Sequence, residues 1–355
     1  MLLNGRHWTR SEILKRVGSP DQLGSVTSFE YSEGKARGVR ALRVQTAAGF
    51  SFCVSPDRGM DIVEATYQGR SLCYISPVGV VHPSYFDSRE MGWLKTFSGG
   101  LLTTCGLANV GSACEDNDEK LGLHGAHSNT PAESVHWHQD WVNDDLISTI
   151  HGTVREAQTL GPNLVLNRTL RTSLSGRTFE LHDVVSNEGF EASPLMILYH
   201  MNFGFPFLTE RSRIYCDSIH IDSRTEFSRL TQDDWKRFNE PVAAINERVY
   251  YHTMRADDDG NVRVVLVSDE FHPDFGIELI YSKSTLPEFV EWKMNRASTY
   301  VLGIEPSNCR VDGRKVERES GRLQVLEPAE QREFNISLRV LDGAAEVADA
   351  LHFLN

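Results

Sequence analysis

The stretch Phe334-Asn335-Ile336-Ser337-Leu338-Arg339-Val340 alternates apolar with polar side chains. This period of two predicts a β-strand with one face on a core and the other in solvent. The segment Phe179-Glu180-Leu181-His182 repeats the pattern, and other short apolar runs also fit strands. These runs cover residues 41–46, 50–55, 135–141, 147–154, 195–201, 262–267, 276–283, 288–294 and 298–304. Most of the chain is therefore expected to be strand.

Turn-forming residues separate these runs at short intervals, as in Ser186-Asn187-Glu188-Gly189 and Asp257-Asp258-Asp259-Gly260. Many short strands with such breaks are typical of antiparallel sheets in a sandwich or barrel. We therefore expect an all-β fold. Residues 80–118 alternate little and contain Gly-rich segments, which predicts a long loop. Long loops in compact domains are usually functional.

Two helices are expected, one near each end of the chain. Thr9 and Glu12 form a capping-box pattern before a short apolar face, and Gly18 offers a stop. A second helix is expected from Ala344 to about Phe353. No break in composition and no repeat divides the rest. The expected organisation is an N-terminal helical extension over residues 1–24 and one β-sandwich domain over residues 25–355.

The composition limits the class of protein. The chain has 355 residues, of which 40% are hydrophobic, so it can bury a large core and is not mainly disordered. A net charge of −13 makes nucleic acid and anionic membranes poor partners. No apolar run is long enough to span a membrane, and the N-terminus lacks the apolar core of a secretory signal. We therefore expect a cytoplasmic protein.

The six cysteines are scattered and form no Cys-x-x-Cys pair. This spacing argues against a disulfide framework and against a structural zinc site. We expect reduced thiols, with Cys53 and Cys216 packed in the core because they lie inside apparent strands.

Two loop segments hold candidate binding residues. Arg58 lies in the turn Ser55-Pro56-Asp57-Arg58-Gly59-Met60-Asp61, where its guanidinium can bind a polar ligand by two hydrogen bonds. The local sequence favours the alternative, a surface arginine paired with Asp57 or Asp61. His124 lies in Leu123-His124-Gly125-Ala126-His127-Ser128, whose small residues leave space around the imidazole. Its alternative is a turn histidine that bonds the backbone.

Two strand segments hold candidate acid–base residues. His200 lies in an apolar run, near the end of the strand and among aromatic residues. It is either a satisfied core group or a poised acid or base. Glu305 follows Val301-Leu302-Gly303-Ile304 directly before Pro306, which places it at the end of a buried strand. Burial raises the pKa of a carboxyl and makes it a better base near neutral pH. Its alternative is a partner for a structural arginine.

Other features are weaker. His136 and His138 face the same side of a strand and could bind a metal with a third ligand, although an ordinary sheet face is the better interpretation. Trp292 could stack on a sugar ring but is better interpreted as core. No P-loop and no Gly-x-Ser-x-Gly motif is present, so nucleotide chemistry and hydrolase triads lose support.

Taken in order, the arginine turn, the His-Gly loop, the histidine strand and the Glu-Pro strand end resemble the aldose 1-epimerase (galactose mutarotase-like) superfamily. The segments 97–107 and 303–306 are similar to an uncharacterised bacterial branch of it. The resemblance covers about residues 25 to 342. It implies a large antiparallel β-supersandwich, with a short helix at each end of this chain.

The resemblance also implies a function. Glu305 would act as the base and His200 as the acid in the exchange of sugar anomers, without a cofactor and without a metal. His124 and Arg58 would bind the sugar. Lys293 is a further candidate for sugar binding, because it would lie near Glu305 if their strands pair. The expected partner is a small sugar or sugar derivative, and a homodimer fits the size of the chain. Two alternatives stay open: a sugar-binding module without turnover, and a metal-dependent sugar isomerase that uses His136 and His138.

Overall fold

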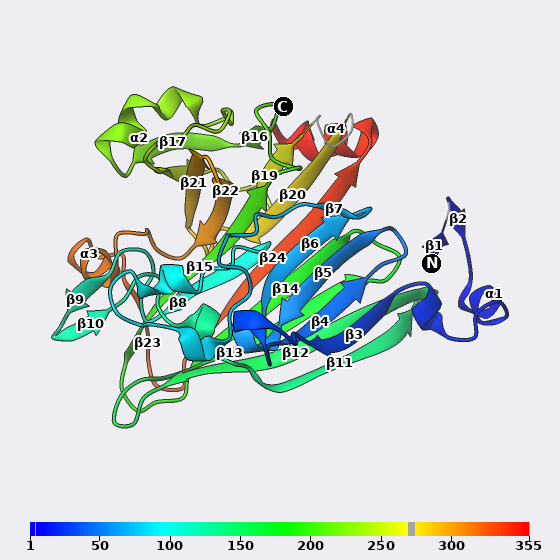
Figure 1. Cartoon of the computed structure of the whole chain (residues 1–355), viewed down its shortest axis with the longest axis horizontal. Helices are drawn as coiled ribbons and strands as arrows, with labels where there is room; N and C mark the ends of the chain where they lie inside the picture. Colours follow the sequence, from blue (N-terminus) through cyan, green and yellow to red (C-terminus); the bar gives the residue numbers. More distant parts are fainter. Residues whose placement is uncertain (4, 269–273, 355) are drawn as a thin grey trace.

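The computed structural model describes residues 1–3, 5–268 and 274–354 of the chain. Two large antiparallel sheets make up most of the molecule (Figure 1). This architecture confirms the expected all-β supersandwich. Among the described residues, no helix is long and apolar enough to cross a membrane.

The larger sheet has 12 strands. In spatial order its main path is β17 (Ser218–Ser223), β18 (Arg248–Met254), β21 (Glu288–Arg296), β22 (Thr299–Ser307), β15 (Ser193–Gly204), β8 (Leu102–Leu107), β6 (Asp61–Tyr67), β5 (Phe50–Ser55), β4 (Arg40–Gln45) and β3 (Ser25–Glu30). Two short strands lie off this path: β23 (Gln324–Leu326) pairs with β15, and β7 (Arg70–Ser71) pairs with β6.

The second sheet has eight strands. Their order is β11 (Glu133–Val142), β12 (Asp145–Ala157), β13 (Asn163–Ser173), β14 (Thr178–Asn187), β24 (Gln331–Asp342), β20 (Phe275–Ser282), β19 (Asn261–Val267) and β16 (Arg213–Cys216).

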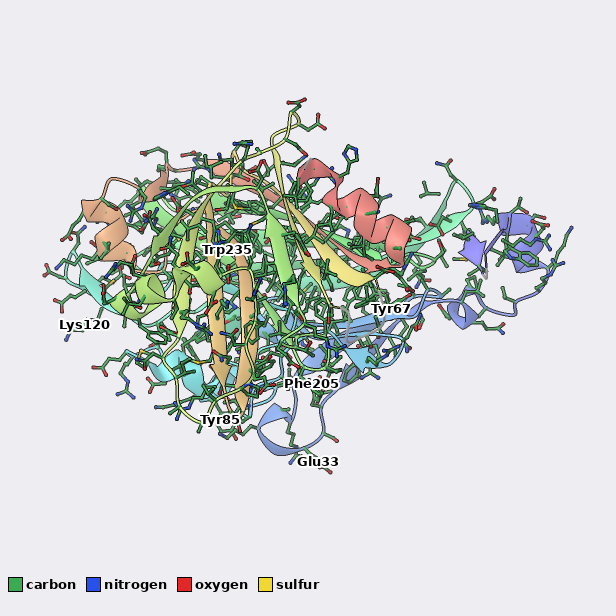
Figure 2. All side chains as sticks on the ribbon, turned by 90° about the horizontal axis from the view of Figure 1, so that it is seen from above. Glu33, Tyr67, Tyr85, Lys120, Phe205 and Trp235 are labelled. Carbon is green, nitrogen blue, oxygen red and sulfur yellow. The ribbon has the colours of Figure 1, made fainter. Side chains whose placement is uncertain are left out.

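Small elements decorate the two sheets. Figure 2 shows Lys120, in the hairpin of β9 and β10, at one end of the molecule and the N-terminal segment at the other. The small elements are β1 (Leu2–Leu3), β2 (Arg6–His7), β9 (Cys114–Asp116), β10 (Glu119–Leu121), α1 (Arg10–Leu14), α2 (Glu226–Leu230), α3 (Arg314–Glu319), α4 (Ala344–Leu351) and the 3-10 turns Pro20–Gln22, Gly34–Ala36, Pro56–Arg58, Pro83–Tyr85, Gly92–Lys95, His127–Asn129, Gln232–Asp234 and His352–Leu354.

The core lies between the inner faces of the two sheets. Phe52 on β5 contacts Phe179 on β14 with ring centroids 5.6 Å apart. Tyr67 on β6 stacks on Phe275 of β20 at the same distance of 5.6 Å. Aromatic pairs of this kind bury large apolar areas and hold the layers in register. The alternating pattern of residues 334–340 arises here, since Phe334, Ile336, Leu338 and Val340 are all buried.

A buried charge network also joins the sheets. The guanidinium of Arg168 on β13 lies 2.7 Å from Asp183 on β14 and 3.1 Å from Asp61 on β6. Tyr199 on β15 donates a 2.8 Å hydrogen bond to the same Asp183 carboxylate. Each charge therefore has a partner, which a buried ion needs in order to be tolerated. Loss of one member would leave an unpaired charge in the core.

The expected helices are confirmed, with shorter bounds at the N-terminus. Thr9 and Glu12 form the capping box of α1, which ends at Leu14, before the expected stop at Gly18. The C-terminal helix, α4, begins at Ala344 as expected. Cys53 and Cys216 are buried in β5 and β16, and all six cysteines are free thiols.

The expectation of a long loop over residues 80–118 is wrong in its centre. Residues Leu102–Leu107 form β8, a central strand of the larger sheet, and all six are buried. A strand buried on both faces has no polar face, so it shows no alternation for a period-two search to find. The remainder of the segment is mainly turns, and it forms part of one wall of a cavity.

Candidate active site

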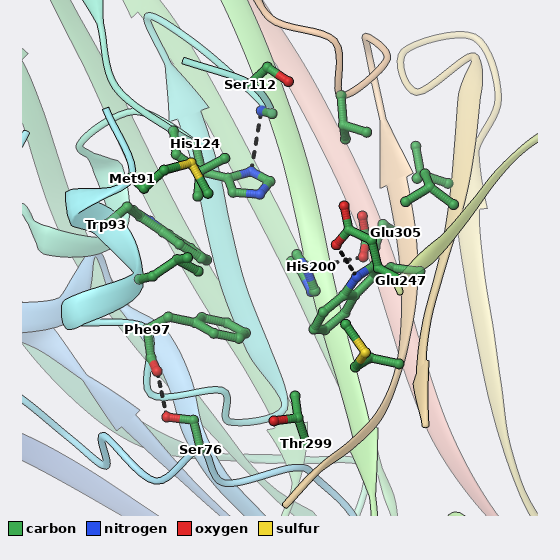
Figure 3. A pocket seen from close by; sticks show the side chains of 18 of the residues that line it. Ser76, Met91, Trp93, Phe97, Ser112, His124, His200, Glu247, Thr299 and Glu305 are labelled. Carbon is green, nitrogen blue, oxygen red and sulfur yellow. Dashed lines mark hydrogen bonds and ion pairs between the residues drawn. The ribbon is translucent and has the colours of Figure 1, made fainter. Parts of the chain in front are cut away.

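A cavity of about 620 Å³ opens on the outer face of the larger sheet. Strands β15, β18, β21 and β22 provide one wall, and segments 74–78, 91–97 and 111–124 provide the opposite wall (Figure 3). Its volume lies in the range of about 300–1,000 Å³ that is typical of small-molecule sites. The lining residues are Tyr74, Ser76, Pro77, Val78, Met91, Trp93, Leu94, Phe97, Gly111, Ser112, Ala113, Leu123, His124, His200, Arg224, Glu247, Val249, Val290, Trp292, Met294, Thr299, Glu305 and Val311.

His200 and Glu305 meet on neighbouring strands of the cavity wall. Met201 of β15 pairs with Ile304 of β22. Because the two strands are antiparallel, this register places His200 opposite Glu305. Glu305 Oε1 lies 3.1 Å from His200 Nε2, and the two side chains are 2% and 6% exposed. The structure thus brings together the two residues that the sequence offered as acid and base.

Gly303 makes room for the carboxyl group of Glu305. A Cβ atom at this position would lie 2.2 Å from Glu305 Oε1, far inside van der Waals contact. The carboxyl group therefore lies over a strand position where only a hydrogen atom fits. This explains why a glycine stands two residues before Glu305.

Burial shifts the proton equilibria of the pair. It raises the pKa of Glu305 well above the ordinary value and lowers the pKa of His200 to about 3. Both shifts have the same cause, since a cavity with little water disfavours the charged form of each group. Both shifts favour the neutral forms, a protonated Glu305 beside a neutral His200, so that the pair shares one ionisable proton.

His124 faces the same cavity from the opposite wall. Its backbone φ is +58°, and its Nδ1 accepts a 3.3 Å hydrogen bond from the Gly111 N–H. This bond leaves the proton of the neutral ring on Nε2. Burial lowers the pKa of His124 to about 3, with smaller effects of His200 and Arg224. His124 is therefore a neutral hydrogen-bond donor, and its ring centroid lies 6.0 Å from that of His200.

Aromatic rings surround the three polar groups. Trp93 packs against His124 with ring centroids 4.7 Å apart and stacks on Phe97 at 4.6 Å. On the strand side, Trp292 contacts His200 at 5.3 Å. Trp292 packs against a buried hydrophobic cluster, as expected of a core residue, and it also lines the cavity. Flat apolar surfaces beside a few polar groups are typical of small-molecule sites.

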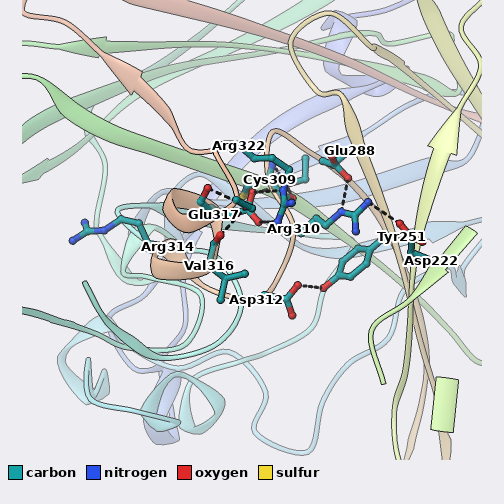
Figure 4. A network of polar contacts seen from close by, with 12 residues as sticks. Asp222, Tyr251, Glu288, Cys309, Arg310, Asp312, Arg314, Val316, Glu317 and Arg322 are labelled. Atoms are coloured by element: carbon teal, nitrogen blue, oxygen red, sulfur yellow. Dashed lines mark hydrogen bonds and ion pairs between the residues drawn. The ribbon is translucent and has the colours of Figure 1, made fainter. Parts of the chain in front are cut away.

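Sequence reasoning missed two charged residues in the cavity wall, Arg224 and Glu247. Trp292 Nε1 donates a 2.9 Å hydrogen bond to Glu247, and the Arg224 guanidinium lies 3.4 Å from the same carboxylate. Arg224 also binds Asp312 at 3.1 Å, and Asp312 accepts a bond from Tyr251 (Figure 4). These contacts fix the position of Glu247 at the edge of the cavity.

The structure does not bring Arg58 to the cavity. Its three guanidinium nitrogens donate to the carbonyl oxygens of Ser128, Val81 and Thr96 at 2.7, 2.7 and 2.8 Å. The side chain is buried, and burial lowers its pKa to about 10. The alternative of a surface arginine paired with Asp57 or Asp61 is wrong as well, because Asp57 pairs with Arg40 and Asp61 pairs with Arg168. Arg58 ties three segments together and does not line the cavity.

Lys293 likewise points away from Glu305. Its neighbours Trp292 and Met294 line the cavity, so the alternation of a strand turns Lys293 to the other face of the sheet. There its Nζ donates to the carbonyl oxygens of Asp234 and Arg237. Burial lowers the pKa of Lys293 to about 8. The expected position of Lys293 beside the base is corrected accordingly.

His136 and His138 also lie outside the cavity lining. They are exposed on the edge strand β11, where both stack on His151 of β12 at 4.8 and 5.5 Å. In the part of the chain that the structure describes, no group of three or more His, Cys, Asp or Glu side chains could hold a metal ion. The geometry therefore does not connect this histidine cluster to the acid–base pair.

The fold is that of galactose mutarotase-like proteins. Residues 36–340 match the family model described as Domain of unknown function (DUF4432), and the chain belongs to that family. A search of curated protein sequences gives no match.

Solved structures agree with this fold. The chain is similar to a structure from Klebsiella pneumoniae described as a "putative aldose 1-epimerase", with a TM-score of 0.88, 26% identity and coverage of 93% of this chain and 87% of that chain. A galactose mutarotase-like protein from Clostridium acetobutylicum gives a TM-score of 0.61 at 13% identity, over 90% and 99% of the two chains. The galactose 1-epimerase of Lactobacillus acidophilus gives 0.57 at 10% identity, over 90% and 99%.

Proposed function

We propose that this protein is a mutarotase-like isomerase that interconverts the anomers of an aldose. The observation that carries the proposal is the contact of His200 Nε2 and Glu305 Oε1, 3.1 Å apart in the wall of an aromatic cavity. Anomer exchange needs one group that accepts a proton and another that donates one, both near the same ring bond. A buried carboxyl–imidazole pair that shares one proton meets this need.

The reaction follows from this shared proton. Glu305, in the ionised form that it takes when the proton is on His200, removes the proton from the anomeric hydroxyl O1. A double bond then forms between C1 and O1, the bond between C1 and the ring oxygen O5 breaks, and His200 delivers its proton to O5. Rotation about the C1–C2 bond turns the other face of the C1 carbonyl toward O5. The reverse steps then close the ring as the other anomer. The pair again holds one proton at the end, so no co-reactant is needed.

Other cavity residues would bind the sugar. His124 donates from Nε2, and the carboxylate of Glu247 accepts hydrogen bonds from hydroxyl groups. Trp93 and Phe97 present flat surfaces on which the C–H face of a sugar ring can stack. The side chain of Glu247 is 44% exposed, so a ligand can reach it at the cavity mouth.

The test separates binding from turnover. We expect Glu305→Gln and His200→Asn to retain sugar binding, followed by tryptophan fluorescence of Trp93 and Trp292, and to lose anomer exchange, followed by NMR. The loss should be at least about 100-fold, since positioned acid–base groups typically contribute 10²–10⁴-fold. Wild-type protein that binds a sugar without accelerating its exchange would instead indicate a sugar-binding module.

The chain offers a matched control. His252 and Glu291 form a second buried His–Glu pair, 3.2 Å apart, which does not line the cavity. Glu291→Gln changes the same chemical groups in the same sheet. It should reduce stability and leave the exchange rate of the folded protein unchanged.

A further inference from the structure

The two ends of the cavity differ in the polar groups that they offer to a ligand. Figure 3 shows Ser112 and His124 at one end, and Ser76 and Thr299 at the other. We propose that the substrate is an aldose with an apolar substituent at C5, such as a 6-deoxyhexose. This inference rests on the proposed function, and it names the class of sugar that the site prefers.

The end near Ser112 and His124 is polar. The N–H of His124 Nε2 faces the cavity here, and the carboxylate of Glu247 is held nearby by Arg224, which also donates a 2.7 Å bond to Ser112 Oγ. Polar groups that are already positioned select hydroxyl groups, because they are left unpaired by an apolar ligand. The hydroxyls at C2 and C3 would lie at this end.

The end near Ser76 and Thr299 has little hydrogen-bonding capacity left. Ser76 Oγ donates a 2.6 Å bond to the Phe97 carbonyl and accepts a 3.1 Å bond from the Val78 N–H. The Tyr74 hydroxyl donates to the Ser298 carbonyl at 3.4 Å. Thr299, which also lines this end, is only partly buried. The buried hydroxyl groups of Ser76 and Tyr74 are therefore engaged within the protein.

Apolar side chains complete the same end. Along β21, Val290 pairs with Glu305, and Met294 lies four residues further toward Thr299, because Arg296 pairs with Thr299. Met294, Phe97 and Val78 thus surround the space beyond the acid–base pair. A buried hydroxyl without a partner is costly there, whereas a methyl group gains contacts.

The chemistry of the pair sets the orientation of the ring. O1 must reach Glu305 and O5 must reach His200, so the edge between C1 and O5 lies against the pair. The polar groups near Ser112 and His124 then favour the placement in which C2 lies toward that end and C5 toward the other. With the C2 hydroxyl at the polar end, the C5 substituent lies at the apolar end, beside Met294 and Phe97.

An anionic C5 substituent is disfavoured for the same reason. Among the described residues, Arg224 is the one Lys or Arg side chain that lines the cavity. Its guanidinium is engaged at the polar end by Glu247, Asp312 and Ser112. Arg58 and Lys293, which could have received a carboxylate or a phosphate, donate to backbone carbonyls elsewhere.

Matched sugar pairs test the inference. Anomer exchange is measured by NMR for D-fucose against D-galactose and for 6-deoxy-D-glucose against D-glucose, with D-glucuronate and glucose 6-phosphate added. We expect kcat/KM to be at least about ten-fold higher for each deoxy sugar, which corresponds to about 1.4 kcal/mol, and to be lowest for the two anions. Equal or higher kcat/KM for the parent hexoses or for an anion would overturn the inference and leave the proposed function intact.

Two variants locate the preference in the cavity. Met294→Gln places an amide at the apolar end and should reduce the ratio of deoxy to parent sugar several-fold. Met91→Gln is the matched control, because Figure 3 places Met91 near His124 at the other end, and its ratio should equal that of wild type. No exchange with any sugar would count against the proposed function. The affinities of the same pairs, measured by tryptophan fluorescence, then decide the substrate class independently.

Discussion

Replacement of Gly303 by alanine is the most specific perturbation of the acid–base pair that the structure offers. The new Cβ would lie 2.2 Å from Glu305 Oε1, where ordinary contact begins near 3.4 Å. The carboxyl group is the tip of a flexible side chain, so it can move by about 1 Å without disrupting the strand. The other close neighbour, Trp292 Cβ at 3.1 Å, needs to yield by only a few tenths of an ångström.

This displacement is expected to reduce turnover more than stability. A misplacement of about 1 Å in a catalytic group can cost about 10²-fold in rate. We therefore expect Gly303→Ala to decrease the kcat for anomer exchange by about 100-fold. Sugar binding should change little, since His124, Glu247 and the Trp93–Phe97 stack on the opposite wall are untouched. NMR exchange rates, thermal unfolding and tryptophan fluorescence measure the three quantities on one sample.

Gly152→Ala provides the matched control. Gly152 is also a strand glycine, on β12, and a Cβ there would lie 2.6 Å from the sulfur of Met60, again the flexible part of a side chain. Neither residue lines the cavity. The control should lose some stability and retain full exchange per folded molecule. A folded Gly303→Ala variant with wild-type exchange would refute the claim that the position of the Glu305 carboxyl group determines the rate.

Three further outcomes are expected. The pH profile of kcat/KM should stay level as the pH falls through 6.5 and decline only toward the His200 pKa of about 3, where the pair gains a second proton. On the alkaline side kcat/KM should decline where Glu305 loses the shared proton, which lies well above pH 4.5. An acid limb near pH 6.5 would contradict the neutral His200. Arg58→Met leaves three buried carbonyls without donors and should decrease the free energy of unfolding by about 3 kcal/mol or more, measured by chemical denaturation; a raised KM at unchanged stability would instead place Arg58 on the sugar. The double variant His136→Ala/His138→Ala should exchange anomers at the wild-type rate by NMR, and a large loss would connect that cluster to the reaction.

Strand alternation predicted much of the fold, because most strands expose one face. It failed at β8, whose residues Leu102–Leu107 are all buried. It also predicted that residues 334–340 form a strand, but not that this strand lies between β14 and β20. Strand order depends on contacts between distant segments, which a local period does not report.

The site illustrates the same limit. His200 and Glu305 were recognisable because each is a titratable residue within an apolar strand. The alternation rule also indicates that Trp292 and Lys293, as neighbours on one strand, face opposite sides, so that only one of them can accompany Glu305. Glu247 had no such signal, since its segment shows no periodicity and it reaches the cavity only in the folded chain.

Arg58 shows how a functional pattern can have a structural cause. The turn at residues 55–61 has the residue types of a ligand-binding loop, yet the guanidinium binds three backbone carbonyls from three separate segments. Those carbonyls belong to Val81, Thr96 and Ser128, which are distant in sequence from Arg58. A local motif therefore could not reveal that its partners lie within the protein.

Anomer exchange by wild-type protein tests the central claim most directly. Purified protein at near-neutral pH is mixed with a panel of aldoses, and the exchange of their anomeric protons is followed by NMR. The contact of His200 with Glu305 predicts accelerated exchange for at least one sugar, with that acceleration absent in Glu305→Gln and retained in Glu291→Gln. Exchange at the uncatalysed rate for every sugar that binds would contradict the assignment of this pair as an acid and a base.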